Sequence, residues 1–411
     1  MDLWRPARPD LQHDLPGSPE RDARLARPHP GSADLADRGL CPFDVAAGDA
    51  RRQYRRHAVA ASRAGAARGR HARRLATAAG HDRAGQLIRA WLAALIAVLL
   101  AGCTPAARSN DIVFVSDEQA NVVHIVDGAT GRIEGVLATG GRPRGMQLSP
   151  DRRTLYVAAG NANRIEAWDI ATRRRTRLLN SGPDPERFVV SPDGRSLYIA
   201  NENDSAVSFL DIASNRPIRA VRVGPEPEGM GVSPDGRLVV ATSEASSTAH
   251  FIDAATGAVR ATVMVGNRPR DVLFLDDGRR IWVSSEQRGT ISVFDAATLR
   301  IVHVIDLVPA FPDVDQVQSV EMKATRDGRR VFVAMGRSNR VAEIDPATMQ
   351  VVRAFPTGER TWGIGLSPDE TRLYAASGLS GTLTIVDLAR NRVARTVNLG
   401  GRPWTALAVA R

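Results

Sequence analysis

Apolar and polar residues alternate over short stretches throughout residues 111–411, as in 155–158 and 207–210. Turn residues interrupt these stretches about every 8–12 positions. Alternation with a period of two predicts half-buried β-strands, and Ser-Pro-Asp-Gly sequences between them predict tight hairpin turns. The pattern therefore predicts an all-β protein built from many short strands.

Two landmarks recur along this region at a nearly constant period. The third residues of the Ser-Pro-Asp turns, two of them degenerate, are spaced 42, 42, 42, 50 and 42 residues apart: Asp151, Asp193, Asp235, Asp277, Asp327 and Asp369. A second series of hairpin aspartates has the same spacing: Asp127, Asp169, Asp211, Asp253, Asp295, Asp345 and Asp387. Four strands per unit, repeated seven times, predict a single seven-bladed β-propeller of four-stranded antiparallel blades. We interpret both turns as structural.

The two ends of the repeat region predict how the ring closes. Residues 402–411 supply a single strand, and residues 111–115 match the second strand of a unit. We therefore expect a composite blade, with its innermost strand from the C-terminus and its outer three from residues 111–138. Such closure removes an exposed sheet edge.

The positive net charge does not indicate a nucleic-acid binder. Residues 1–102 carry 17 basic and 10 acidic residues, which leaves 38 and 35 for residues 103–411. The propeller region is therefore nearly neutral, with charges of both signs intermixed, whereas a nucleic-acid groove needs a dense basic face. Two cysteines, Cys41 and Cys103, are too few for a disulfide scaffold or a cysteine-based zinc site, and we expect neither a metal nor a cofactor.

The N-terminal quarter predicts an export signal preceded by an extension. Residues 1–86 are rich in Arg, Ala, Pro and Gly and read as a disordered extension or a misassigned start. Residues 87–102 hold an apolar run too short to span a bilayer, which takes roughly 20 residues, but suited to a signal peptide. The sequence 100–103, LAGC, resembles the lipobox of bacterial lipoproteins. That resemblance implies lipidation of Cys103, a linker at 103–110, and a periplasmic protein anchored by lipid alone, in the outer membrane rather than the inner.

Charged residues gather at fixed phases of the repeat, on the loops that enter each innermost strand. Positions nine and seven residues before the Ser-Pro-Asp aspartate hold a mixed ring: Arg142, Arg144, Asp184, Glu186, Glu226, Glu228, Arg268, Arg270, Arg360, Trp362, Arg402 and Trp404. A second ring, nine residues before the hairpin aspartate, holds Glu118, Glu202, Glu244 and Glu286. Both rings belong to the face on which propellers usually bind ligands.

This ring has two interpretations. Its charges can simply pair with one another on neighbouring blades, which adds little stability. Alternatively, clustered arginines suit the recognition of carboxylates, and a neighbouring tryptophan suits a planar ligand. The eight additional residues of the longer repeat lie on the same face and include an apolar segment, 307–312, which is either a lid, a docking knob or a tolerated insertion.

Whole stretches of the region resemble YVTN-type propeller repeats. These are GGRPRGMQLSPD at 140–151, NENDSAVSFLDI at 201–212, GPEPEGMGVSPDGRLVVATSE at 224–244 and GGRPWTALAV at 400–409. They are most similar to the periplasmic propellers associated with PQQ-dependent alcohol catabolism. That resemblance implies a non-catalytic binding protein that assists PQQ-dependent alcohol oxidation through its mouth, with a quinoprotein dehydrogenase or a cytochrome as partner.

Two other functions stay open. The chain resembles the propeller lactonases as well, which implies a hydrolase with Glu228 or Glu244 as general base and the arginines as an oxyanion clamp. The third possible function is adhesion, by a propeller at the cell surface. In each case we expect a monomer that binds no nucleic acid.

Overall fold

Seven four-stranded antiparallel sheets form a closed ring in the computed structural model, which describes residues 110–411. This confirms the seven-bladed all-β propeller predicted from the repeat. The extension, signal peptide and lipidated cysteine expected before residue 110 lie outside the described residues. Within 110–411, no helix combines the length and the apolar character needed to cross a bilayer.

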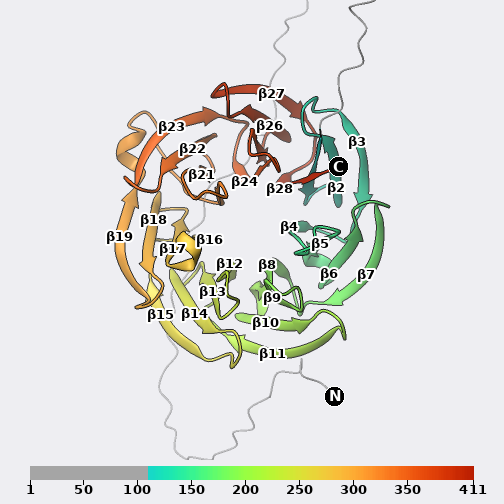
Figure 1. Cartoon of the computed structure of the whole chain (residues 1–411), viewed down its shortest axis with the longest axis vertical. Helices are drawn as coiled ribbons and strands as arrows, with labels where there is room; N and C mark the ends of the chain where they lie inside the picture. Colours follow the sequence, from blue (N-terminus) through green and yellow to red (C-terminus); the bar gives the residue numbers. More distant parts are fainter. Residues whose placement is uncertain (1–109) are drawn as a thin grey trace, which may run out of the picture. The chain divides into compact units, whose positions relative to one another are not determined.

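In the description of each blade below, the strands are named in order from the channel to the outer rim (Figure 1). The composite blade consists of β28 (Pro403–Ala410), β1 (Asp111–Asp117), β2 (Val122–Asp127) and β3 (Ile133–Ala138). The next blade holds β4 (Pro143–Leu148), β5 (Thr154–Ala159), β6 (Arg164–Asp169) and β7 (Arg174–Asn180). The third holds β8 (Pro185–Val190), β9 (Ser196–Asn201), β10 (Ala206–Asp211) and β11 (Arg216–Arg222). The fourth holds β12 (Pro227–Val232), β13 (Leu238–Ser243), β14 (Thr248–Asp253) and β15 (Val259–Met264).

The remaining blades follow the same order. They are β16 (Pro269–Leu275), β17 (Arg280–Ser285), β18 (Thr290–Asp295) and β19 (Arg300–Asp306); β20 (Met322–Ala324), β21 (Val331–Ala334), β22 (Arg340–Asp345) and β23 (Gln350–Pro356); and β24 (Thr361–Leu366), β25 (Arg372–Ser377), β26 (Thr382–Asp387) and β27 (Arg392–Asn398). Short 3₁₀ turns interrupt four loops: η1 (Gly160–Ala162), η2 (Glu202–Asp204), η3 (Asp276–Gly278) and η4 (Val308–Ala310).

Apolar side chains of adjacent blades face one another and form seven separate clusters. Phe114 of β1, for example, lies with Leu155 of β5 and Trp168 of β6. The largest cluster also buries Leu307 and Phe311 of the longer repeat. That segment is therefore anchored in the core rather than free to act as an open knob.

The landmark turns are held by short side-chain contacts, in agreement with a structural role. The Ser191 hydroxyl donates a hydrogen bond to Asp193 Oδ1 at 2.6 Å, and the Ser196 amide donates one to Ser191 Oγ at 2.9 Å. The Thr256 amide likewise donates to Asp253 Oδ1 at 2.9 Å.

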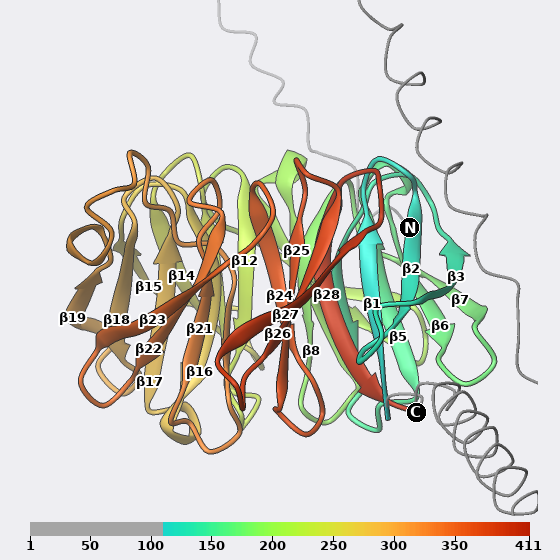
Figure 2. The same cartoon turned by 90° about the horizontal axis from the view of Figure 1, so that it is seen from above.

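The loops lie at the two ends of the strands (Figure 2). We call the end that carries the loops before the inner strands the mouth face, and the other the hairpin face.

Closure of the ring follows the predicted composite blade. Strand β28 pairs antiparallel with β1, so the innermost and second strands of this blade come from opposite ends of the repeat region. The buried carboxylate of Asp117 fixes the junction, since it accepts hydrogen bonds from the amides of Ala120 and Arg402, both at 2.9 Å. His124 Nε2 lies 3.2 Å from its other oxygen.

We expect Asp117→Ala to destabilise the propeller by about 1–2 kcal/mol, because the amides of Ala120 and Arg402 would lose the acceptor that joins the two ends of the ring. Ser377→Ala is the matched control, since Ser377 occupies the same repeat position in a blade made of one continuous segment. Thermal unfolding followed by circular dichroism measures both. Equal losses in the two variants would contradict a special role of Asp117 in closure.

Candidate functional site

The mouth face brings most of the predicted ring residues together in a layer of charge with two halves. The loop residue nine positions before the Ser-Pro-Asp aspartate has left-handed backbone in five repeats: φ lies between 48° and 57° at Arg142, Asp184, Glu226, Arg268 and Arg360. Asparagine side chains support this repeated loop geometry, because the amides of Arg142 and Asp184 donate to Asn121 Oδ1 and Asn163 Oδ1 at 2.8 and 2.9 Å.

One half of the layer centres on the carboxylate of Glu186, which is fully buried. Arg144 donates to Glu186 Oε2 at 2.6 Å and to Glu118 Oε2 at 2.7 Å. Arg142 contacts Asp184 and lies 2.8 Å from Glu186 Oε1. The arginines thus bridge three neighbouring blades.

The other half centres on the buried guanidinium of Arg270. It contacts Glu228 and Glu244 and donates to Glu286 Oε2 at 2.7 Å. Arg268 is more exposed, and its Nη2 lies 2.7 Å from Glu244 Oε2. Five of the predicted residues therefore form one network on blades β12–β15 and β16–β19.

The tryptophans lie between these halves. Trp362 and Trp404 are stacked with ring centroids 6.4 Å apart, and the Arg360 guanidinium lies 4.1 Å from the centroid of Trp362. Arg360 also donates to Glu286 Oε1 at 3.0 Å. The indoles are thus covered by the protein's own cations. Glu226 and Arg402 differ from the rest, because both are exposed at the rim.

Burial and like charge perturb the acidity of the mouth carboxyls. A hydrogen bond with Glu186, together with burial and the charge of Glu186, raises the pKa of Glu202 to about 7. Burial and the neighbouring Glu228 raise the pKa of Glu244 as well. Burial alone would raise the pKa of Glu228, but the charges of Arg270, Arg144 and Arg187 outweigh it and lower that pKa. Carboxyls whose pKa values are shifted in opposite directions are therefore neighbours, an arrangement also found in acid–base sites.

Two hollows open at the mouth face on either side of Arg268. One, of about 500 Å³, is lined by Glu202, Glu226, Glu244, Asn267, Arg268 and Gln287, among others. The other, of about 510 Å³, is lined mainly by cations and by the longer repeat, including Arg268, Arg288, Asp315, Gln318, Arg337 and Arg360. Glu228 lines neither hollow. The first hollow thus holds two carboxyls of raised pKa beside a half-exposed guanidinium.

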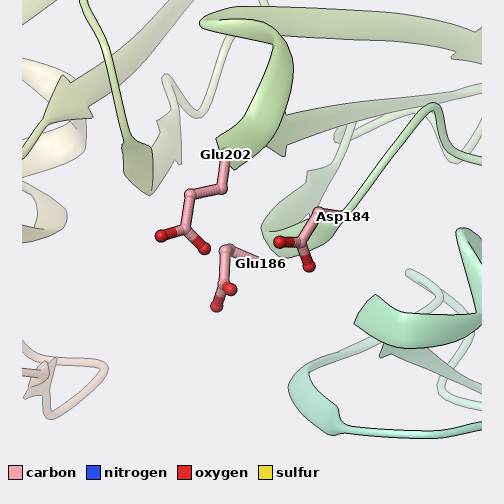
Figure 3. Close-up of side chains that lie close together, drawn as sticks. All are labelled: Asp184, Glu186 and Glu202. Atoms are coloured by element: carbon pink, nitrogen blue, oxygen red, sulfur yellow. The ribbon is translucent and has the colours of Figure 1, made fainter.

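Asp184, Glu186 and Glu202 converge near this hollow (Figure 3). Each offers one oxygen, and these atoms lie within 4.8 Å of one another, which suits a hard cation that prefers oxygen ligands. Arg142 contacts two of the three carboxylates, so a guanidinium supplies the positive charge at this point.

Sequence reasoning missed a third ring, six positions before the Ser-Pro-Asp aspartate. Strand alternation places this position on the opposite face from the seventh, but the pairings of β8 with β9 and of β16 with β17 shift register near the proline. Arg187 and Asp271 therefore face the channel, where Arg187 Nη1 lies 3.4 Å from Asp271 Oδ1. The sequence did hold a sign of this ring, since charged residues such as Arg187 and Asp271 occur at one repeat position of strands that are otherwise mainly apolar.

Comparison with known proteins yields one family. The model of the family described as "Lactonase, 7-bladed beta-propeller" matches residues 122–396. A search of curated protein sequences returns no match.

Solved structures share the fold at low sequence identity. A periplasmic gluconolactonase, PpgL, from Pseudomonas aeruginosa is 22% identical with a TM-score of 0.62, covering 73% of this chain and 99% of that one. Hydrazine synthase from Kuenenia stuttgartiensis is 22% identical with a TM-score of 0.60, covering 68% and 93%. A functionally unknown protein from Desulfotomaculum acetoxidans is 13% identical with a TM-score of 0.62, covering 73% and 98%.

The raised pKa of Glu202 predicts a pH-dependent effect on stability. The folded protein holds a proton on Glu202 up to about pH 7, whereas the ordinary value is 4.5, so the stability that this proton contributes is complete below pH 4.5 and is lost as the pH rises through 7. Glutamine resembles the protonated form. We therefore expect Glu202→Gln to leave Tm nearly unchanged at pH 4 and to raise it at pH 8.

Glu118→Gln is the control for this measurement, because Glu118 occupies the same ring position but its carboxylate is paired with Arg144. That variant should lose stability at pH 8. A lower Tm for Glu202→Gln at pH 8 would mean that attraction to Arg142, rather than repulsion from Glu186, dominates at Glu202.

Proposed function

Because the chain belongs to the family of seven-bladed propeller lactonases, we propose that it hydrolyses a lactone in the mouth-face hollow that contains Glu202, Glu244 and Arg268. The observation that carries this proposal is the joint presence, in one hollow, of two carboxyls with raised pKa and a half-exposed guanidinium. Lactone hydrolysis needs a base, an acid and a cationic partner for the carbonyl oxygen, and these three groups have those properties.

In the proposed mechanism, Glu202 is the general base. Its pKa of about 7 leaves much of it ionised at neutral pH, and a base with a pKa near the working pH is the most effective. The Glu202 carboxylate takes a proton from water, and the water oxygen forms a bond to the lactone carbonyl carbon. Negative charge then develops on the carbonyl oxygen, next to the guanidinium of Arg268, which stabilises it.

Collapse of this intermediate breaks the bond between the carbonyl carbon and the ring oxygen. Glu244 is placed to donate its proton to that oxygen, because burial and the charge of Glu228 keep it protonated. The products are a hydroxy acid and a deprotonated Glu244, which recovers the proton from Glu202 through solvent. In this scheme Glu228, which is buried and paired with Arg270, positions the guanidinium layer instead of acting as a base.

Assay of the purified protein against five- and six-membered lactones, including glucono-δ-lactone, tests the proposal by pH-stat titration. We expect turnover to fall by about 100-fold or more in Glu202→Gln and in Glu244→Gln, as general acids and bases contribute typically 10²–10⁴-fold. Arg268→Met should lose a comparable factor, since removal of an oxyanion partner costs about 10²–10³. The acid limb of kcat/KM should have an apparent pKa of about 7, from Glu202.

Glu118→Gln is the matched control and should retain near wild-type turnover, because Glu118 lines neither hollow. A folded protein that hydrolyses none of these lactones, or variants of Glu202 and Glu244 with full activity, would overturn the proposed mechanism. The other expectation, a scaffold for PQQ-dependent alcohol oxidation, has no support in the family match.

A further inference from the structure

The channel beneath the mouth contains a second charged cluster that the proposed reaction does not use. Arg187 of β8 lies 3.1 Å from Glu321 Oε1 through its Nη1, and Lys323 of β20 lies 2.8 Å from the same oxygen through its Nζ. The carboxylates are fixed by backbone amides, because Ile364 donates to Glu321 Oε2 at 2.7 Å. Lys323 is the single lysine of the whole sequence.

Two adjoining cavities surround this cluster. Their volumes are about 300 and about 270 Å³, and both are lined by Gln147, Glu321, Lys323 and Thr405. The second extends to Arg152 and to residues of the Ser-Pro-Asp turns, so this part of the channel opens toward the hairpin face. Neither cavity shares a lining residue with the two hollows of the mouth face. A ligand bound here would therefore occupy a separate site.

Two polar atoms at this site are buried without a hydrogen-bond partner. They are Arg187 Nε and Thr405 Oγ1, on residues that are 9% and 4% exposed and that line the first cavity. A buried donor left without an acceptor costs about 1–3 kcal/mol, so such groups in a folded protein call for an explanation. The Lys323 ammonium adds further donors, since its side chain is 37% exposed and contacts a single carboxylate oxygen.

Arg187 Nε is a donor, the Thr405 hydroxyl can donate, and the Lys323 ammonium carries donors beyond its contact with Glu321. A carboxylate offers two oxygens that accept charge-assisted hydrogen bonds, and it fits this set better than a neutral or cationic ligand does. Apolar side chains, such as Val189 and Leu273, line the same cavity. These walls suit a short carbon chain, and the volume lies at the lower end of ligand pockets.

We infer that the channel is a binding site for a small organic carboxylate, held by Lys323, Arg187 and Thr405 and entered from the hairpin face. The inference does not depend on the lactonase activity, because it uses different residues and a different opening. A hydroxy acid of a few carbons, such as lactate, is a suitable probe.

The single lysine makes the site directly observable. In protein labelled with ¹³C-lysine, one side-chain Cε–Hε resonance reports on Lys323. We expect it to shift and saturate during titration with sodium lactate, and to stay in place with sodium chloride at equal ionic strength. An unsaturated change, or the same change with both salts, would overturn the inference and leave water as the partner of the two buried donors.

Two variants provide an independent check by isothermal titration calorimetry with lactate. Lys323→Met and Thr405→Val should each weaken binding, the first by about tenfold or more, which corresponds to about 1.4 kcal/mol. Thr405→Val keeps the shape of the side chain, so it stays informative if Lys323→Met folds poorly. Undiminished binding in both would overturn the inference.

Glu202→Gln is the matched control at the mouth face and should bind lactate as the wild type does. Loss of binding in that variant would place the lactate in the mouth hollow and refute a channel site. Conversely, Lys323→Met should retain lactone hydrolysis. A failure of the lactonase assay leaves the NMR result untouched, so the two proposals fail separately.

Discussion

The pairing of β28 with β1 is the constraint on which the rest of the molecule depends. Without β28, β1 would be the exposed inner edge of a three-stranded blade, and the first and last repeats would not be joined in one sheet. The junction is secured by interactions over the largest sequence separations in the described chain, such as the hydrogen bond from the Arg402 amide to Asp117 Oδ1. Once the ring is closed, all seven inner strands are held at fixed distances, and their loops face one another across the mouth.

Fixed inner strands explain how charges from distant repeats form single networks. Arg360 lies in the loop that enters β24. It donates a hydrogen bond to Glu286, which follows β17, two blades before the blade of β24. Arg187 and Glu321 are separated by 134 residues and meet in the channel. Neither contact is local in the sequence, and each depends on the number of blades.

The repeat predicted most of the fold, because a period of 42 residues with two turn landmarks leaves little freedom in strand number or order. The composition of the mouth was also predictable: two phases of the repeat gave Arg142, Arg144, Glu186, Glu228 and Arg270, and the structure places them in ion-paired clusters. The pKa values of the individual carboxyls could not be predicted from the sequence. Which carboxyl stays protonated depends on distances to several charges at once, and Glu202 and Glu244 differ from Glu228 through contacts that a linear sequence does not encode.

The channel cluster escaped prediction for a more specific reason. Simple alternation assigns Arg187 to the face away from the mouth ring, and the irregular pairing of β8 with β9 reverses that assignment. The glycines at the same repeat phase serve this geometry: a Cβ at Gly145 would lie 2.7 Å from the Glu186 carbonyl oxygen, so the inner strands can approach closely only where that position lacks a side chain.

Buried ion pairs are weak evidence for stability, because removing two charges from water costs about as much as their attraction returns. The propeller has no need of them for its fold, since seven apolar clusters between blades already stabilise the ring. Yet carboxylates and guanidiniums are concentrated at the mouth and in the channel, where Glu186, Arg270 and Glu321 are buried. Burying a charge costs free energy even when the charge is paired. Stability and charge are thus divided in this molecule: the apolar clusters between blades stabilise the ring, and the surfaces that converge on the channel axis carry the buried charge.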